Sequence, residues 1–546
     1  IALVLLVVLL YFRRVQALLV MGACIFIGLF WTFGLTQLAI GHLNVATAFL
    51  ISIVAGNGIN VGILYQARYY EERRGGASVP AALETALAAT WRPTLVAALA
   101  AGASYGSLLI TDFRAFRHFG LIAGAGMLLC WFATTLALPP LLALLGGRKG
   151  EAPPARGAGY GDLFAWLVPR APAAWVALGA VAILIGSVAT ARYVQSDPME
   201  YDMNRVQNDR TRTADLHRAW AIATDVLGAS QGAMVVLTDT PAEAKQLHDE
   251  LQAKWDAAPE GSKPFVSVTS LWSFVPEGQA AKIPTLVALG ERLRRAHERG
   301  LLPEDAWAKL EAVLPPDDLR PFTLADLPAS LAETFTERDG TRGTLVLIAA
   351  EPTESNDLRY LLRYTESFRE TRLASGKVVR GSGRAVIFAD MLEAVVQDVP
   401  KAISLSLGLT LLTVVLTFRR ASQSLPILFS LLAGVAAVGA FLYFAGVRIN
   451  FLNFAALPIT FGIGVDYAVN VAQRYHEDKG RDVAAALRTS GGAVVLCSLT
   501  TMLGYLALLV SHNQAIRGLG VIAVVGEIAC LLSAMLVLPA LWIVFS

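Results

Sequence analysis

The sequence predicts a polytopic α-helical membrane protein made of two related halves, with an α/β domain inserted in the second half. Three observations support this fold class. Hydrophobic residues make up 55% of the 546 positions, and the mean hydropathy is +0.54. The residues from Gln195 to Pro400 are far more highly charged than the rest. The sequences on either side of that segment match each other at a nearly constant spacing.

The apolar segments are numerous and long enough to cross a membrane many times. A membrane-spanning helix needs about 20 consecutive, mostly apolar residues. We expect eleven crossings, the first of them incomplete, at residues 1–12, 16–40, 43–66, 92–111, 117–145, 172–194, 398–418, 423–446, 449–472, 491–511 and 516–545.

The charges between the crossings predict the orientation of the chain. Lys and Arg are enriched in cytoplasmic loops of membrane proteins. Here they gather on one side, at residues 13–14, 68–92, 148–170, 419–420 and 474–488. We therefore expect that side to be cytoplasmic. The charged segment from about 195 to 397 then lies on the outer side, which is the periplasm if the membrane is the inner membrane of a Gram-negative bacterium.

The outer segment reads as an acidic α/β domain. Gln195 to Pro400 contains 23 Lys and Arg against 32 Asp and Glu, a net charge of −9. Apolar periodicity predicts strands at 233–237, 344–349 and 376–381, and helices at 241–255 and 357–371. A helical insertion at about 276–338 splits two β-α-β units, which suggests a ferredoxin-like sandwich. The predicted domains are a first-half bundle (1–147), a cytoplasmic linker (148–171), a seventh helix (172–194), the periplasmic domain (195–397) and a second-half bundle (398–546).

The two bundles are copies of each other. At an offset of 406 residues, Phe12-Arg13-Arg14 matches Phe418-Arg419-Arg420, and further matches are Asn44 with Asn450, Gly56 with Gly462, Gly58 with Gly464 and Arg68-Tyr69 with Arg474-Tyr475. Later in each copy the offset becomes 400, and Tyr105, Arg117, Gly120 and Pro139 match Tyr505, Arg517, Gly520 and Pro539. Both halves then share one orientation, as in a parallel repeat about an axis along the membrane normal. We also expect a first helix and a first periplasmic domain to precede Ile1 in a longer protein.

The run Gly462-Ile463-Gly464-Val465-Asp466-Tyr467 places a carboxylic acid in the middle of a predicted crossing. A carboxylate near the bilayer centre costs about 2.5–3.5 kcal/mol on insertion scales. Acids in such positions usually face a bundle interior and mark an ion or proton path. At the 406 offset the counterpart of Asp466 is Asn60, so the copies differ at their most unfavourable position.

Other polar side chains follow the same asymmetry. The second half carries Tyr467, Asn470, Ser498, Thr500, Thr501 and Glu527, where the first half has Val61, Leu64, Ala98, Ala100, Ala101 and Met127. Both copies pack helices of one kind, so packing alone does not require these groups. We therefore predict a proton relay in the second half.

Each predicted relay residue has a specific role and a simpler alternative. Asp466 and Glu527 would bind and release protons, Tyr467 would donate to a carboxylate, and Thr500 and Thr501 would bridge an acid to water. Asn57 and Asn60 share a helical face and would offer Asp466 neutral partners. Alternatively, Asp466 and Glu527 are structural hydrogen-bonding groups, and the threonines bond to their own helix backbone. The paired glycines are more typical of close helix packing than of chemistry.

The Gly-x-Gly-x-Asp-Tyr run, the duplicated six-helix plan and the large outer domain resemble the resistance-nodulation-division (RND) superfamily. Within it, Asp466-Tyr467 resembles the lipid-exporting MmpL branch, and the length is similar to that of hopanoid transporters. The resemblance implies an RND-type pseudo-two-fold bundle and proton-driven antiport. It assigns the relay acid to Asp466 and the relay hydroxyl to Thr500 or Thr501. Because Asn60-Val61 replaces the acid found in many relatives, Asp466 and Glu527 would carry the relay.

The function expected from the sequence is proton-coupled export of hydrophobic, hopanoid-like lipids from the inner membrane towards the outer membrane. We expect a homo-oligomer, with a dimer favoured, no nucleic-acid partner, and no cofactor other than the coupling protons. No Walker loop, zinc-type Cys/His spacing or Gly-x-Ser-x-Gly elbow appears, so the sequence does not suggest an enzyme. The alternatives are a hydrophobic drug efflux pump, a sterol-sensing or receptor-like protein without transport, and a proton-driven motor for protein export.

Overall fold

The computed structural model describes residues 1–44, 47, 49–145, 159–208, 215, 218–219, 221–222, 233–316, 318–351, 357–477 and 482–545. The chain divides into two compact units, one of Ile1–Ala214 with Met391–Ser546 and the other of Asp215–Asp390. The boundary lies inside the long helix α15 (Arg384–Thr417).

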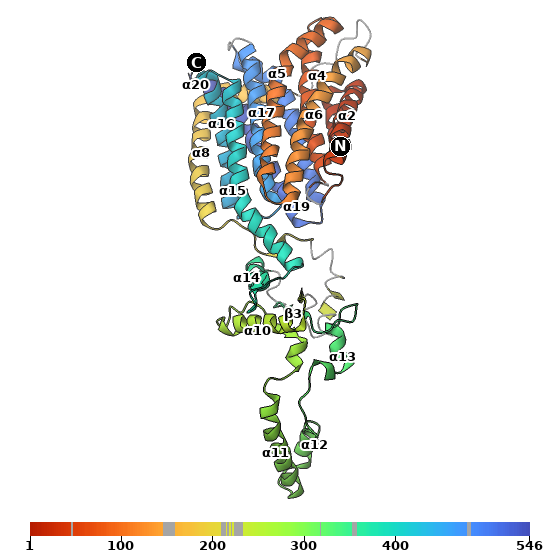
Figure 1. Ribbon diagram of the computed structural model, residues 1–546. Helices are drawn as coiled ribbons and strands as arrows, with labels where there is room; N and C mark the ends of the chain where they lie inside the picture. Colours follow the sequence, from red (N-terminus) through yellow and green to blue (C-terminus); the bar gives the residue numbers. More distant parts are fainter. Residues whose placement is uncertain are drawn as a thin grey trace. The chain divides into compact units, whose positions relative to one another are not determined.

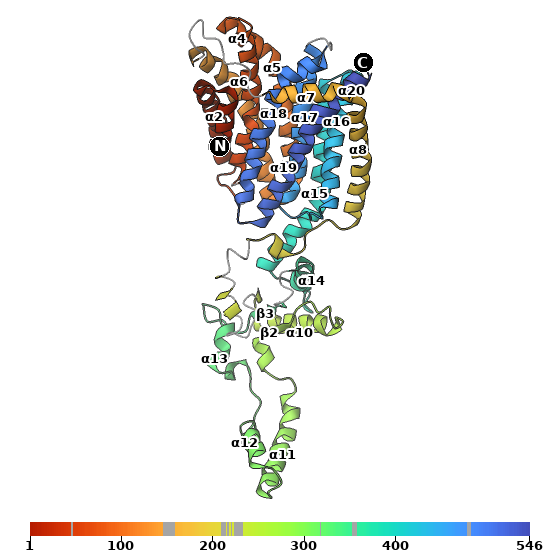
Figure 2. The same cartoon turned by 180° about the vertical axis from the view of Figure 1, so that it is seen from behind.

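The larger unit is a bundle of apolar helices (Figures 1 and 2). Among the described residues, ten helical spans are long and apolar enough to cross a membrane, and Ala2–Phe12 is a shorter apolar helix. The prediction of a polytopic helical membrane protein is confirmed. Some helices match the predicted crossings closely, such as Pro172–Gln195, whereas Val79–Ile110 and Arg384–Thr417 begin more than ten residues earlier, because their polar ends continue the helix beyond the apolar stretch.

The first half contains α1 (Ala2–Phe12), α2 (Val15–Ala39), α3 (Leu50–Gly58), α4 (Asn60–Arg74), α5 (Val79–Gly106) with the 3-10 turn Ser107–Ile110, and α6 (Arg114–Leu145). The second half contains α8 (Pro172–Gln195), α15, α16 (Ala421–Phe444), α17 (Ala456–Glu477), α18 (Val483–Leu506) and α19 (Gln514–Leu532). A π-helical segment, Ser533–Val537, connects α19 to α20 (Leu538–Phe545). Helices α3 and α4 form one span, Leu50–Arg74, and Ile59 between them keeps right-handed helical backbone angles.

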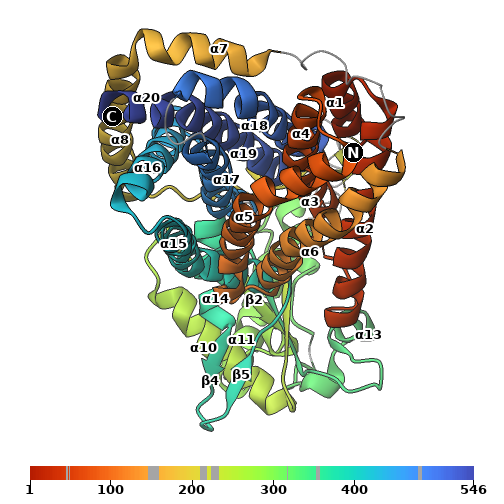
Figure 3. The ribbon, with the colours of Figure 1, turned by 90° about the horizontal axis from the view of Figure 1, so that it is seen from above.

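The predicted linker at 148–171 contains a helix, α7 (Tyr160–Leu167). Figure 3 shows α7 beside α18 at the edge of the bundle. Gly161 makes this contact possible, since a Cβ atom there would clash with the carbonyl oxygen of Leu487. Residues 146–158, the rest of that linker, lie outside the described residues.

The smaller unit contains a three-stranded sheet in the order β1-β3-β2, formed by β1 (Met234–Leu237), β2 (Ser267–Ser270) and β3 (Leu345–Ala349). Both outer strands run antiparallel to β3, and Met234 and Val268 both pair with Ile348. Helix α10 (Pro241–Ala257) contacts the sheet and buries Ala244, Leu247 and Leu251, which recur at helical spacing.

The order β1-β3-β2 matches three strands of a ferredoxin-like sheet, and the full four-stranded arrangement stays a prediction. After α14 (Leu358–Phe368), the strands β4 (Glu370–Arg372) and β5 (Val378–Arg380) pair with each other as a separate hairpin. The predicted helix at 357–371 therefore ends earlier than expected. The insertion contains α11 (Gln279–Glu298), α12 (Glu304–Glu311) and α13 (Ala329–Ala332). Leu271, Leu327, Ala332 and Phe335 form an apolar cluster at its base.

Glycine contacts show how the two halves of the bundle pack against each other. A Cβ atom on Gly462 of α17 would lie 2.9 Å from the Cα atom of Ala101 in α5. Its counterpart Gly56 in α3 faces α18 in the same way, with the carbonyl oxygen of Thr500 at 3.2 Å. Gly462 of α17 thus packs against α5 of the first half, and Gly56 of α3 packs against α18, the equivalent helix of the second half. This reciprocal packing is what an internal duplication about a pseudo-two-fold axis produces.

Candidate functional site

Asp466 lies on α17 with amide groups from both halves around its carboxylate. Asn470, one turn further along α17, donates from Nδ2 to Oδ1 of Asp466 at 2.7 Å and also to the Asp466 carbonyl oxygen. Asn60, at the start of α4 in the first half, donates from Nδ2 to Oδ2 at 3.4 Å. The two oxygens of this acid therefore each have a partner, and one of those partners belongs to the opposite half.

Asn60 connects Asp466 to the threonines of α18. Its Nδ2 lies 3.4 Å from the Thr501 hydroxyl, and its Oδ1 accepts from the Thr500 hydroxyl at 3.4 Å. Thr500 also donates to the carbonyl oxygens of Leu496 and Cys497, at 3.1 and 2.8 Å. Thr500 therefore contacts Asn60, as a relay role requires, and also bonds to its own helix backbone, as a structural role requires. The bonds to the backbone are the shorter ones. Thr501, by contrast, donates at 3.3 Å to Gly56 of the first half.

The second acid, Glu527 on α19, is 1% exposed. The hydroxyl of Tyr467 on α17 donates to its Oε1. Ser498 on α18 is also fully buried. Neither the Ser498 hydroxyl nor Oε2 of Glu527 has a hydrogen-bond partner of good geometry among the described residues. Glu527 therefore has unused hydrogen-bonding capacity in an apolar setting.

Asn57 does not join this group, contrary to the expectation that it would face Asp466 together with Asn60. Its Nδ2 donates to the hydroxyl of Tyr105 at 2.6 Å and lies 3.3 Å from that of Tyr505. Ile59 between the two asparagines keeps right-handed helical backbone angles, but the two side chains turn to different partners. The shared face predicted from their spacing is thereby divided between two sets of partners.

Two polar groups at the seam between the halves were not predicted. Tyr105 and Tyr505 occupy equivalent positions and meet at Asn57, although the sequence indicated them only as markers of the repeat. Ser104 of α5 contacts Thr410 and Ser406 of α15, with oxygen distances of 3.0 and 3.1 Å. Small hydroxyl residues in apolar helices are common where helices pack closely, so the sequence did not indicate that these three would contact each other.

The arrangement suits the binding of a proton more than that of a metal ion. Within the described part of the chain, no Lys or Arg lies within 4.0 Å of Asp466 or Glu527, and no cluster of His, Cys, Asp and Glu could hold a metal. A buried acid without a cationic partner is neutralised by taking up a proton. Asp466 is only partly buried, whereas Glu527 is buried.

Comparison with known proteins agrees with this architecture. The MMPL family model matches residues 1–175 and 205–546. The chain is 24% identical over 584 residues to the hopanoid transporter HpnN of Rhodopseudomonas palustris and 25% identical over 582 residues to that of Burkholderia multivorans. Both alignments cover 95% of this chain but only 64% and 63% of the relatives, so the chain spans somewhat less than two thirds of their length.

A solved structure shows the same fold. The translocon-associated membrane protein SecDF of Thermus thermophilus superposes with a TM-score of 0.59 at 16% identity, over 100% of this chain and 60% of that one. Because the family model covers most of the sequence and the helical architecture agrees, the chain belongs to the MMPL family.

Proposed function

We propose that this protein is a proton-coupled RND-type exporter of hydrophobic lipids, with hopanoids as the favoured cargo, in the inner membrane of a Gram-negative bacterium. Its family, its many apolar helices and its similarity to two hopanoid transporters support the lipid cargo. The proton coupling is supported by the site itself.

The observation that carries the proposal is that Asp466 is held by amides from both halves. Asn470 belongs to its own helix, whereas Asn60 belongs to the other copy and is at the far limit of a hydrogen bond, at 3.4 Å. A small movement of one half against the other would remove or shorten only the Asn60 contact. The energy of protonating Asp466 would therefore depend on how the halves are placed. Reciprocally, proton binding would favour one placement.

The membrane potential supplies enough energy for such a cycle. One elementary charge crossing the membrane provides about 2.3 kcal/mol per 100 mV. In this mechanism Asp466 takes up a proton from the periplasmic side and releases it on the cytoplasmic side. The contact of Tyr467 with Glu527 places a second acid in the same polar cluster. Asn60 and the threonines of α18 position the first.

The decisive test replaces Asp466 with asparagine, which keeps the shape but cannot ionise. We expect Asp466→Asn to abolish lipid export and proton flux while the protein still folds and inserts. The matched control is Asp398→Asn in α15, another buried acid of the bundle. Asp398 accepts from the backbone N–H of Asp112 at 2.6 Å and pairs with Lys401 outside the cluster.

Two measurements separate the possible outcomes. The lipid composition of the outer membrane reports cargo delivery, and a pH-sensitive dye in inverted membrane vesicles reports proton flux. Wild-type export and flux in Asp466→Asn would refute the relay. Unchanged lipid composition together with altered drug susceptibility would instead indicate efflux of hydrophobic drugs.

A further inference from the structure

A pocket lies at the ends of α4, α5, α17 and α18, on the side that the loop charges predict to be cytoplasmic. Seven of its lining residues come from the first half and seven from the second. Every residue of the first set matches one of the second at the 406 or 400 offset, as Arg68 matches Arg474. A cavity lined by complete sets of equivalent residues must lie on the pseudo-two-fold axis.

The pocket reaches within one side chain of the relay acid. Asn470 belongs to its wall, and the Nδ2 atom of Asn470 donates to Oδ1 of Asp466 at 2.7 Å. The equivalent wall residue of the first half is Leu64, which offers no polar group. The symmetric pocket therefore has a polar inner wall on the side of the acid only. This agrees with the partial exposure of Asp466.

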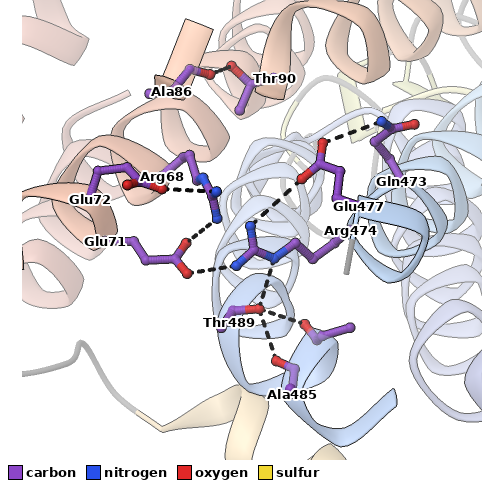
Figure 4. A network of polar contacts seen from close by, with 11 residues as sticks. Arg68, Glu71, Glu72, Ala86, Thr90, Gln473, Arg474, Glu477, Ala485 and Thr489 are labelled. Atoms are coloured by element: carbon purple, nitrogen blue, oxygen red, sulfur yellow. Dashed lines mark hydrogen bonds and ion pairs between the residues drawn. The ribbon is translucent and has the colours of Figure 1, made fainter. Parts of the chain in front are cut away.

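An ion pair crosses the pocket between the halves (Figure 4). Arg474 Nη2 lies 2.7 Å from Glu71 Oε1, and Arg474 is only 11% exposed. Glu71 is also 3.0 Å from Arg68 of its own helix. Pairs between exposed side chains contribute only about 0–1 kcal/mol. Glu71 is 32% exposed, so this partly shielded pair falls at the upper end of that range.

The symmetry of the lining allows two such cross-pairs, and the structure contains one. The counterpart of Glu71–Arg474 would join Arg68 to Glu477, and no such pair lies within 4.0 Å among the described residues. The Nε atom of Arg68 is buried without a hydrogen-bond partner. The charges are therefore arranged asymmetrically about the axis, as in one of two alternative states.

We propose that this pocket is the aqueous passage between Asp466 and the cytoplasm, and that the Glu71–Arg474 ion pair is the latch that controls it. The inference rests on the proposed function and adds the release route to it. With the latch closed, the cytoplasmic ends of the halves are held together. When it opens, water reaches Asn470, and the Asp466 carboxyl group transfers its proton to that water and becomes a carboxylate.

Thiol accessibility tests the passage independently of transport. Ser490 lines the pocket, and Ser406 is fully buried at the seam between the halves, so Ser490→Cys and Ser406→Cys are matched isosteric changes. The four native cysteines are all buried, which keeps the background low. With a small charged methanethiosulfonate applied to the cytoplasmic face of vesicles holding the intact protein, we expect only Ser490→Cys to react.

The latch is tested by adding Glu71→Gln to Ser490→Cys. We expect labelling to accelerate by about fivefold, which corresponds to about 1 kcal/mol in the closing equilibrium. Glu72→Gln is the matched control. It removes the same charge one residue away, from an acid that pairs with Arg68 at 2.9 Å within one helix. It should leave the labelling rate unchanged.

The results distinguish this inference from the proposed function. An unreactive Ser490→Cys in a protein with normal Asp466-dependent proton flux would overturn the passage and leave the function standing. Equal labelling rates in Glu71→Gln and Glu72→Gln would overturn the latch. Labelling that follows the expected pattern in a protein without proton flux would support the passage and refute the coupling.

Discussion

Replacing Gly462 with alanine should force the two halves apart close to the buried acid. The new Cβ atom would lie 2.9 Å from the Cα atom of Ala101 and 2.9 Å from the Cβ atom of Ser104. Ordinary contact begins at 3.4 Å, so α17 and α5 must separate by about 0.5 Å. Backbone atoms cannot rotate away, and the strain must be taken up by the helices. Asp466 is one turn further along α17, and its 3.4 Å contact with Asn60 has no room to lengthen.

The magnitude follows from two opposing terms. Overpacking a well-packed interior costs about 1–3 kcal/mol, whereas alanine is favoured over glycine in a helix by about 1 kcal/mol. Gly408→Ala in α15 is the control, because a Cβ atom there has nothing within 4 Å. It gains the helix term without the strain. Gly462→Ala should therefore be about 1–3 kcal/mol less stable than Gly408→Ala, and it should lose export.

Thermal unfolding in lipid nanodiscs, followed by intrinsic fluorescence, measures the difference between these two variants. Gly56→Ala provides a graded third point, since its tightest contact, the Thr500 carbonyl oxygen, is at 3.2 Å. The expected order of stability is Gly408→Ala, then Gly56→Ala, then Gly462→Ala. If Gly462→Ala were as stable as Gly408→Ala, the close packing of the halves described above would be wrong.

Two further predictions concern single hydrogen bonds and pH. Tyr467→Phe removes the donor to Glu527 and should cost about 1–3 kcal/mol; the loss should largely disappear in a Glu527→Leu background, and additive losses in thermal unfolding would contradict the contact. In the smaller unit, burial lowers the pKa of His248, so the folded state favours the neutral ring. Stability should then fall as the pH drops through the unfolded value of about 6.5, and His248→Gln should flatten that dependence in urea unfolding; an identical pH profile in both proteins would refute this.

The sequence was sufficient to predict which residues of the two copies meet. The offset of 406 placed Asn60 opposite Asp466, and the structure brings these side chains within 3.4 Å. Tyr467 was expected to donate to a carboxylate, and it does so to Glu527. The first contact follows because a duplicated bundle brings equivalent positions towards a common axis. Tyr467 and Glu527 belong to the same half and meet because α17 packs against α19. The transport roles of these residues remain proposals.

Other features depend on geometry that a linear pattern does not contain. Asn57 and Asn60 lie three residues apart on one helical span, yet Asn57 contacts Tyr105 whereas Asn60 contacts Asp466. Arg68 and Arg474 were evident as repeat markers and as charges that set the orientation, because charged residues at helix ends usually lie in solvent. The pairing of Arg474 with Glu71 across the axis requires the helices to be assembled. Strand β2 (Ser267–Ser270) is too short and polar for its alternation to predict a strand.

The reciprocal glycine contacts restrict how the two halves of the bundle can move relative to each other. At both seams, main-chain atoms of one copy rest directly against those of the other, and the two seams are related by the axis. If one half moved along the axis relative to the other, the residues next to the two glycines would collide with the opposite helix backbone at both contacts. A turn of one half about the axis would press one of the two contacts closer and open the other. The backbone packing at both places therefore limits the relative motion of the halves in either direction.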